Sequence, residues 1–151
     1  MGKFQDKNIK SISNILKKRQ EVSFAYLFGS QAKGKAGPLS DLDIAVFFNH
    51  KVSKDERNSI RYDIKDEIEI ALEMPDKVDV IPLNDAQPLL EREVVYKGKI
   101  IYNKDDEARA HYEAGAIGRW LDWKWYDDQF GKAIMKNLEK PVKPYLWQIN
   151  K

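Results

Sequence analysis

Two aspartates, Asp41 and Asp43, stand at the start of an apolar stretch, DLDIAVFF. In a strand, residues i and i+2 point to the same face, so these two carboxylates would lie side by side. Like charges beside apolar neighbours repel each other and lose hydration, and a divalent cation between them offsets both costs. Oxygen ligands of this kind suit Mg²⁺, which favours one or two carboxylates plus substrate phosphates. The pair therefore predicts a Mg²⁺ site.

A Gly-Ser turn is the second feature of the sequence that could take part in chemistry. Gly29 and Ser30 follow an apolar run, VSFAYLF, that is typical of a central strand. Backbone N–H groups at such a turn can hold phosphate oxygens, and the serine hydroxyl adds a donor. Lys33 and Lys35 follow closely and can supply positive charge. Both elements lie at the ends of adjacent strand candidates, so we expect them to face one site.

Asp79 is a third acid, placed between Val78 and Val80 in a short strand candidate. If this strand neighbours the one carrying Asp43, a third carboxylate joins the pair. Three such acids suit metal-assisted nucleotidyl transfer, in which metals bridge the triphosphate and an acceptor hydroxyl attacks in line. Taken alone, Asp79 fits a solvated strand face better, and a lone pair of aspartates is a weak signal. The combination of all three elements favours the functional interpretation.

The full pattern, Gly29-Ser30, ten residues and then Asp41-x-Asp43, resembles the signature of the DNA polymerase β-type nucleotidyltransferase superfamily. The stretch GSQAKGKAGPLSDLDIAVFF resembles in particular the minimal nucleotidyltransferases, the MNT proteins. This resemblance implies transfer of a nucleoside monophosphate from a nucleoside triphosphate. It implies catalytic and metal-binding roles for Asp41, Asp43 and Asp79, and nucleotide binding by Gly29, Ser30 and Ser40, to which Lys33 is added for its charge.

The resemblance also implies an acceptor. Stand-alone proteins of this length resemble the antitoxin of HEPN–MNT toxin–antitoxin pairs, in which AMP from ATP is transferred to a tyrosine of the HEPN ribonuclease toxin. We therefore expect ATP as substrate, two Mg²⁺ ions and a HEPN-family partner. Two alternatives stay open. The chain could be a binding-only antitoxin or scaffold that neutralises its partner by occlusion, or a nucleotidyltransferase for a small molecule such as an antibiotic.

Hydrophobic periodicity predicts the elements that position these residues. We expect helices over 6–20, from the capping box at Ser53 to Pro75, from a cap within 84–87 to Gly98, and over about 103–130. We expect strands over 22–28, 41–48, 77–81 and 99–102, the last at a sheet edge. The fold class is α/β (α+β), a small mixed sheet flanked by helices with a C-terminal helical extension. The predicted division is a nucleotidyltransferase core over 1–103 and a C-terminal helix and tail over 104–151.

Composition narrows the function classes. The 151 residues include no cysteine, which excludes disulfide and thiolate sites and suits the cytoplasm. No stretch approaches the ~20 apolar residues of a membrane span. The net charge of +2 conceals basic ends around an acidic middle, since residues 1–20 hold six Lys/Arg against one acid. We therefore expect no direct nucleic-acid binding.

All four tryptophans fall within the last 32 residues, three of them in GRWLDWKWYDDQF. A helix buried on one face cannot hide Trp120, Trp123 and Trp125 together. This segment either folds back over its own sheet or forms a partner surface, since Trp and Tyr are enriched at interfaces. The two histidines, His50 and His111, lack a metal-ligand spacing, and His111 fits surface or helix packing better than catalysis.

Overall fold

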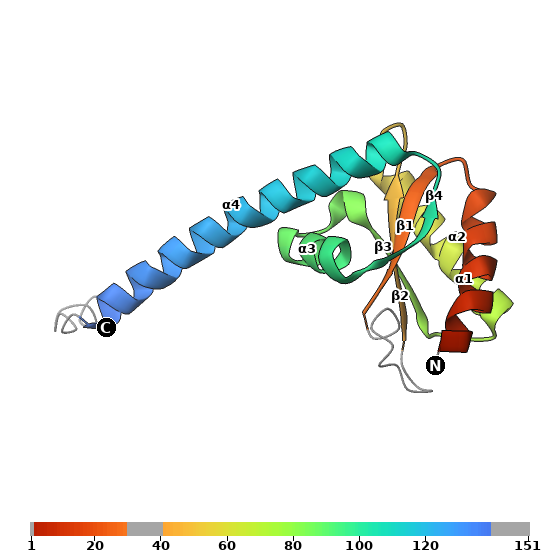
Figure 1. Ribbon diagram of the computed structural model, residues 1–151, viewed down its shortest axis with the longest axis horizontal. Helices are drawn as coiled ribbons and strands as arrows, with labels where there is room; N and C mark the ends of the chain where they lie inside the picture. The colour runs from red at the N-terminus through yellow and green to blue at the C-terminus, as the bar shows by residue number, and fades with distance from the viewer. Residues whose placement is uncertain (1, 30–40, 140–151) are drawn as a thin grey trace, which may run out of the picture.

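The protein forms one four-stranded mixed sheet in the computed structural model, which describes residues 2–29 and 41–139 (Figure 1). The strands are β1 (Val22–Phe28), β2 (Leu42–Phe48), β3 (Val78–Pro82) and β4 (Lys99–Asn103), and the helices are α1 (Gly2–Lys17), α2 (Lys54–Leu72), α3 (Pro88–Lys97) and α4 (Asp106–Glu139), with a 3-10 turn η1 (Leu83–Asp85). The strand order is β3-β2-β1-β4. β1 pairs antiparallel with β2 and β4, whereas β2 and β3 are parallel. The predicted fold class is confirmed.

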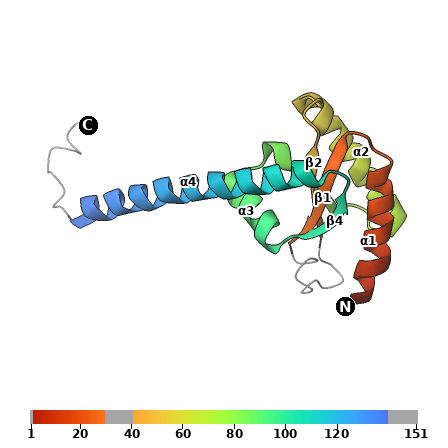
Figure 2. The same ribbon diagram turned by 45° about the horizontal axis from the view of Figure 1, so that its top comes forward.

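Helices cover both faces of the sheet, which explains why its central strands are apolar on both sides. Helices α1 and α2 lie on one face and α3 and α4 on the other (Figures 1 and 2). Leu42, Ile44 and Val46 of β2 are buried with α1 and α2, and the alternate residues Ala45 and Phe47 pack towards α3 and α4. β1 is buried along its whole length, as predicted for a central strand.

Local signals set most helix ends. The Ser53 side chain accepts a hydrogen bond from the backbone N–H of Glu56, which confirms the predicted capping box of α2. α2 ends at Leu72, before the predicted Pro75, because Glu73 adopts a left-handed conformation with φ 55°. The predicted cap of α3 within 84–87 is confirmed at Gln87, which is followed by Pro88 in the first turn. The Asn84 side chain exchanges two hydrogen bonds, of 3.0 and 2.9 Å, with the Phe48 backbone and connects η1 to the end of β2.

Helix α4 is longer than predicted and leaves the sheet. Its first part packs on β1 and α3, and Trp120 still meets α3, where the Arg92 guanidinium stacks 4.5 Å from the indole centroid. From Leu121 to Leu138 every residue is exposed, so these residues do not fold back over the sheet. The predicted irregular tail from residue 141 lies outside the described residues. Within the described ranges, no helix is both long and apolar enough to cross a membrane.

A buried carboxylate joins α3 to α4. Glu91 is only 3% exposed although it is charged. Its two oxygens accept a 2.8 Å hydrogen bond from the Tyr112 hydroxyl and bonds of 2.9 and 2.8 Å from the Arg119 guanidinium. Burial, followed by the hydrogen bond and charge of Glu91, raises the pKa of Tyr112 and keeps its hydroxyl a donor. Arg119 therefore compensates a charge that is almost completely removed from water.

We predict that Arg119→Met lowers the free energy of unfolding by about 3 kcal/mol, because removing one partner leaves a buried charge uncompensated. Lys97→Met is the matched control. Lys97 and Arg119 are both 50% exposed, but the Lys97 partner, Glu93, is itself 38% exposed. The control should cost less than about 1 kcal/mol. Urea denaturation measures both, and equal losses would contradict a special role for the buried carboxylate.

Candidate active site

Two of the three predicted acids are direct neighbours where β2 and β3 begin. Asp43 and Asp79 are each the second residue of their strand, and they are partners in the parallel register. Both alternate with residues buried under α1 and α2, so both point to the opposite face of the sheet. Asp41 is exposed and lies two residues before Asp43, immediately ahead of β2. The sheet thus places β3 beside β2, the adjacency on which the prediction for Asp79 depended.

Gly29 brings the end of β1 against the same carboxylate. The last residue of β1, Phe28, is the antiparallel partner of Asp43, and Gly29 follows it with φ +76°. A side chain is strained at this φ. A Cβ placed on Gly29 would also collide with Oδ2 of Asp43. The positive φ therefore favours glycine at this turn, and a larger residue would also have to displace the Asp43 carboxylate, which the Gly29 backbone approaches closely.

The surroundings of Asp43 disfavour its negative charge. Partial burial raises the pKa of the Asp43 carboxyl, and the charges of Asp79 and Asp41 raise it further. Among the described residues, no Lys or Arg contributes to this shift. A folded chain that gathers repelling carboxylates in a half-buried position gains when a cation neutralises them.

The donor set suits a magnesium ion that completes its coordination with substrate. In the part of the chain that the structure describes, no group of three or more His, Cys, Asp or Glu side chains is arranged to hold a metal on its own. Mg²⁺ does not need such a cage, because it is commonly bound through one or two carboxylates plus phosphates and water. Asp41 and Asp43 fit this requirement. The predicted phosphate-binding residues Ser30, Lys33 and Ser40 lie outside the described residues.

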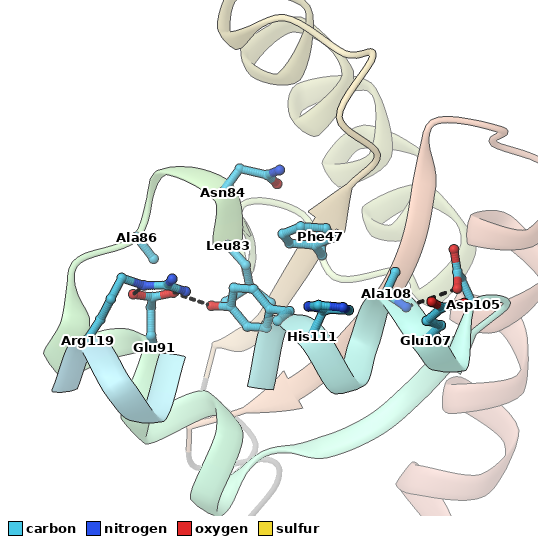
Figure 3. A pocket seen from close by; sticks show the side chains of 11 residues that line it. Phe47, Leu83, Asn84, Ala86, Glu91, Asp105, Glu107, Ala108, His111 and Arg119 are labelled. Carbon is cyan, nitrogen blue, oxygen red and sulfur yellow. Dashed lines mark hydrogen bonds and ion pairs between the residues drawn. The ribbon is translucent and has the colours of Figure 1, made fainter. Parts of the chain in front are cut away.

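A cavity of about 780 Å³ opens on the same side of the sheet, towards the other end of β2 (Figure 3). Phe47 lines it and lies four residues from Asp43, roughly 13 Å along the strand. Glu91, Tyr112 and Arg119 form one wall. His111 also lines it and is exposed on α4, which agrees with a surface position.

The sequence contains a weak signal for the Glu91 side of this cavity. Glu91 and Val94 are three residues apart and occupy the same buried side of α3. An acid on a buried helical stripe calls for a cationic or hydroxyl partner. The partners, Tyr112 and Arg119, lie on α4, so only the tertiary structure identifies them.

Comparisons with known proteins bear on family and fold. Residues 10–107 match the family described as polymerase beta, nucleotidyltransferase. No curated protein matches the chain in sequence. A chain of a toxin–antitoxin structure with AMP-PNP shares 22% identity and a TM-score of 0.69, over 85% of this chain and 98% of that one. A chain of an MntA-HepT toxin–antitoxin structure shares 22% identity and a TM-score of 0.66, over 87% and 99%.

A third structure is a tri-AMPylated Shewanella oneidensis HEPN toxin in complex with an MNT antitoxin. One of its chains is 21% identical to this one, with a TM-score of 0.65 over 87% of this chain and 98% of that one. At such identities these structures share the fold with this chain. The family match covers Gly29 and all three acids, and it stops at the start of α4. The chain therefore belongs to the polymerase β-type nucleotidyltransferase family.

Proposed function

We propose that this protein transfers AMP from ATP to a tyrosine hydroxyl of a HEPN-family toxin and thereby acts as its antitoxin. The observation that carries the proposal is that Asp43 and Asp79 are partners in the register of β2 and β3, with the Gly29 backbone close to the Asp43 carboxylate. The similar folds support the choice of acceptor. They come from toxin–antitoxin complexes, one with AMP-PNP and one with an AMPylated HEPN toxin.

The three acids would have different roles in the reaction. Asp41 and Asp43 would hold Mg²⁺, which when bound neutralises phosphate charge and polarises the phosphoryl group under attack. Asp79, one strand further along the sheet, would accept the proton of the acceptor hydroxyl. The tyrosine oxygen then forms a bond to the α-phosphorus, the bond from that phosphorus to the α–β bridging oxygen breaks, and pyrophosphate leaves.

The turn after β1 would position the nucleotide. The Gly29–Ser30 backbone would donate N–H groups to phosphate oxygens, as turns of this kind do. Lys33 and Ser40 would add contacts from the connection between β1 and β2. Without a cation the three carboxylates would repel the triphosphate, so the acids and the nucleotide depend on the same bound metal.

The direct test is transfer of labelled AMP from Mg-ATP to a co-purified HEPN toxin. We expect Asp41→Asn with Asp43→Asn to lower transfer by about 100-fold or more, since a metal supplies several kcal/mol of transition-state stabilisation. Asp79→Asn should lower turnover by about 100-fold while nucleotide binding persists, as expected for loss of a general base. Asp63→Asn, an exposed acid on the far side of the sheet, is the matched control.

Unchanged transfer by the Asp41 and Asp43 double variant would contradict the proposed metal role. Toxin neutralisation is measured in parallel, as recovery of growth when both proteins are expressed. Full neutralisation by a variant that no longer transfers AMP would favour the binding-only alternative.

A stability measurement tests the charge repulsion separately from catalysis. Since the Asp43 pKa is raised in the folded protein, the ionised carboxylate destabilises the fold at neutral pH, and this penalty disappears below its unfolded pKa of about 3.9. Asp43→Asn should therefore raise the Tm in EDTA at pH 7, with the difference shrinking as the pH is lowered towards 4. Mg-ATP should stabilise the wild type and stabilise the variant less. A lower Tm for the variant in EDTA would refute the repulsion.

Gly29→Ala tests the turn. The positive φ and the collision with Asp43 should lower the free energy of unfolding by about 1–3 kcal/mol and weaken nucleotide binding. Gly118→Ala is the matched control. Gly118 is exposed within α4 with open space around its Cβ position, so alanine there should stabilise by up to about 1 kcal/mol. Thermal denaturation with and without Mg-ATP measures both effects. A neutral Gly29→Ala would contradict the close approach.

A further inference from the structure

The part of α4 beyond the sheet exposes apolar side chains around most of its circumference, and one stripe of them runs lengthwise with no cover among the described residues. Every residue from Leu121 to Leu138 is exposed, including Tyr126 and Phe130 at 69% each. Both views show this part of the helix projecting away from the sheet (Figures 1 and 2). Large exposed apolar surfaces on a soluble domain mark interaction sites. Most of the stability of a helix in a protein comes from packing of its apolar face, which this part of α4 lacks among the described residues.

The stripe continues the buried side of the same helix. Tyr112 and Ala116 face the sheet, and Phe130 lies about five full turns after Tyr112, so it points in the same direction. Along this side, Trp123, Tyr126, Phe130 and Ala133 follow one another at spacings of three, four and three. These spacings are those of the a and d positions of a two-helix coiled coil. The projecting part therefore has the pattern of a helix that packs lengthwise on another.

Size and charge both fit a second copy of this chain in antiparallel orientation. With a two-fold axis near residue 128, Trp123 meets the small Ala133 of the other copy, and Tyr126 meets Phe130. The same register places Asp122 beside Lys136 of the other copy on the flank of the seam, twice by symmetry. A parallel pair would set Trp123 against Trp123 and, on the flank, Asp122 against Asp127 of the other copy. Opposite charges on the flanks select orientation in such pairs.

We propose that the protein forms a dimer through an antiparallel pairing of α4 over residues 121–138. The interface is isologous, so each copy contributes the same stripe. It involves none of the candidate catalytic acids. It is therefore independent of whether the chain transfers AMP.

The proposal is tested by sedimentation velocity on the full chain over a range of micromolar concentrations. The wild type should approach twice the chain mass of 17.6 kDa. Phe130→Asp should abolish dimerisation. Ile70→Asp, at a position 79% exposed on α2, is the matched control and should leave it unchanged. Trp fluorescence gives a second readout, because dimerisation removes Trp123 from water and should shift the emission to shorter wavelength.

Charge reversal tests the orientation. Asp122→Lys and Lys136→Asp should each weaken the dimer by about tenfold, since each creates two like-charged contacts. The double variant should recover wild-type affinity, and an equimolar mixture of the two single variants should form heterodimers. The register also sets the two Asp127 side chains nearest the axis, so Asp127→Asn should strengthen the dimer.

All these positions are exposed in the single chain, so the variants should fold. A wild type that stays monomeric throughout the concentration range would overturn the proposal. So would a double variant no tighter than the single variants. A chain that gains mass only when a HEPN toxin is added would instead assign the stripe to that partner.

Discussion

The repulsion between Asp43 and Asp79 is the constraint around which the rest of the domain is arranged. The parallel register of β2 and β3 sets these acids side by side, and partial burial makes the charge of Asp43 costlier. The strands do not separate because their other faces are packed under α1 and α2, where Ile44 and Val80 are almost fully buried. Apolar burial on one face of the sheet thus maintains an electrostatically unfavourable arrangement on the other. Stored repulsion of this kind is typical of sites that await a cation or substrate.

The helices on the two faces of the sheet are packed in different ways, which agrees with the different roles of these faces. The α1 and α2 side is a continuous apolar core that includes Ile12, Leu16 and Ile64. The α3 and α4 side mixes aromatic packing, such as Phe24 stacked on Phe47 at 4.8 Å, with polar ties such as the Glu91 network. A buried ion pair adds little net stability compared with apolar packing, but it tolerates one geometry. Here it joins α3 to α4 through Tyr112 and Arg119, near the point where α4 leaves the sheet.

Sequence reasoning succeeded where the determining physics was local. A continuous apolar run rich in β-branched and aromatic residues located β1 at its observed bounds, and the Ser53 cap located the start of α2. From the sequence, Asp79 could be placed beside Asp43 only on the condition that their strands are neighbours. Strand order depends on long-range packing, so the sequence alone did not show that they are. The partners of Glu91 were not predictable, since Tyr112 and Arg119 lie on another helix. The hydrogen bonds of Asn84 to the Phe48 backbone were likewise not predictable, since the two residues are 36 positions apart in the sequence.

The geometry of α4 also explains how one small chain could combine self-association with action on a large acceptor. α4 contacts the sheet through Tyr112, which packs against Phe24 and Phe47. Those residues lie towards the opposite end of their strands from Gly29 and Asp43, so the helix does not lie over the acids. Its apolar stripe extends beyond the domain, and pairing there would not require the acids to be covered. The proposed acceptor, a protein tyrosine, would need an open approach to the phosphorus, and a helix that carries the apolar surface away from the acids would preserve that approach.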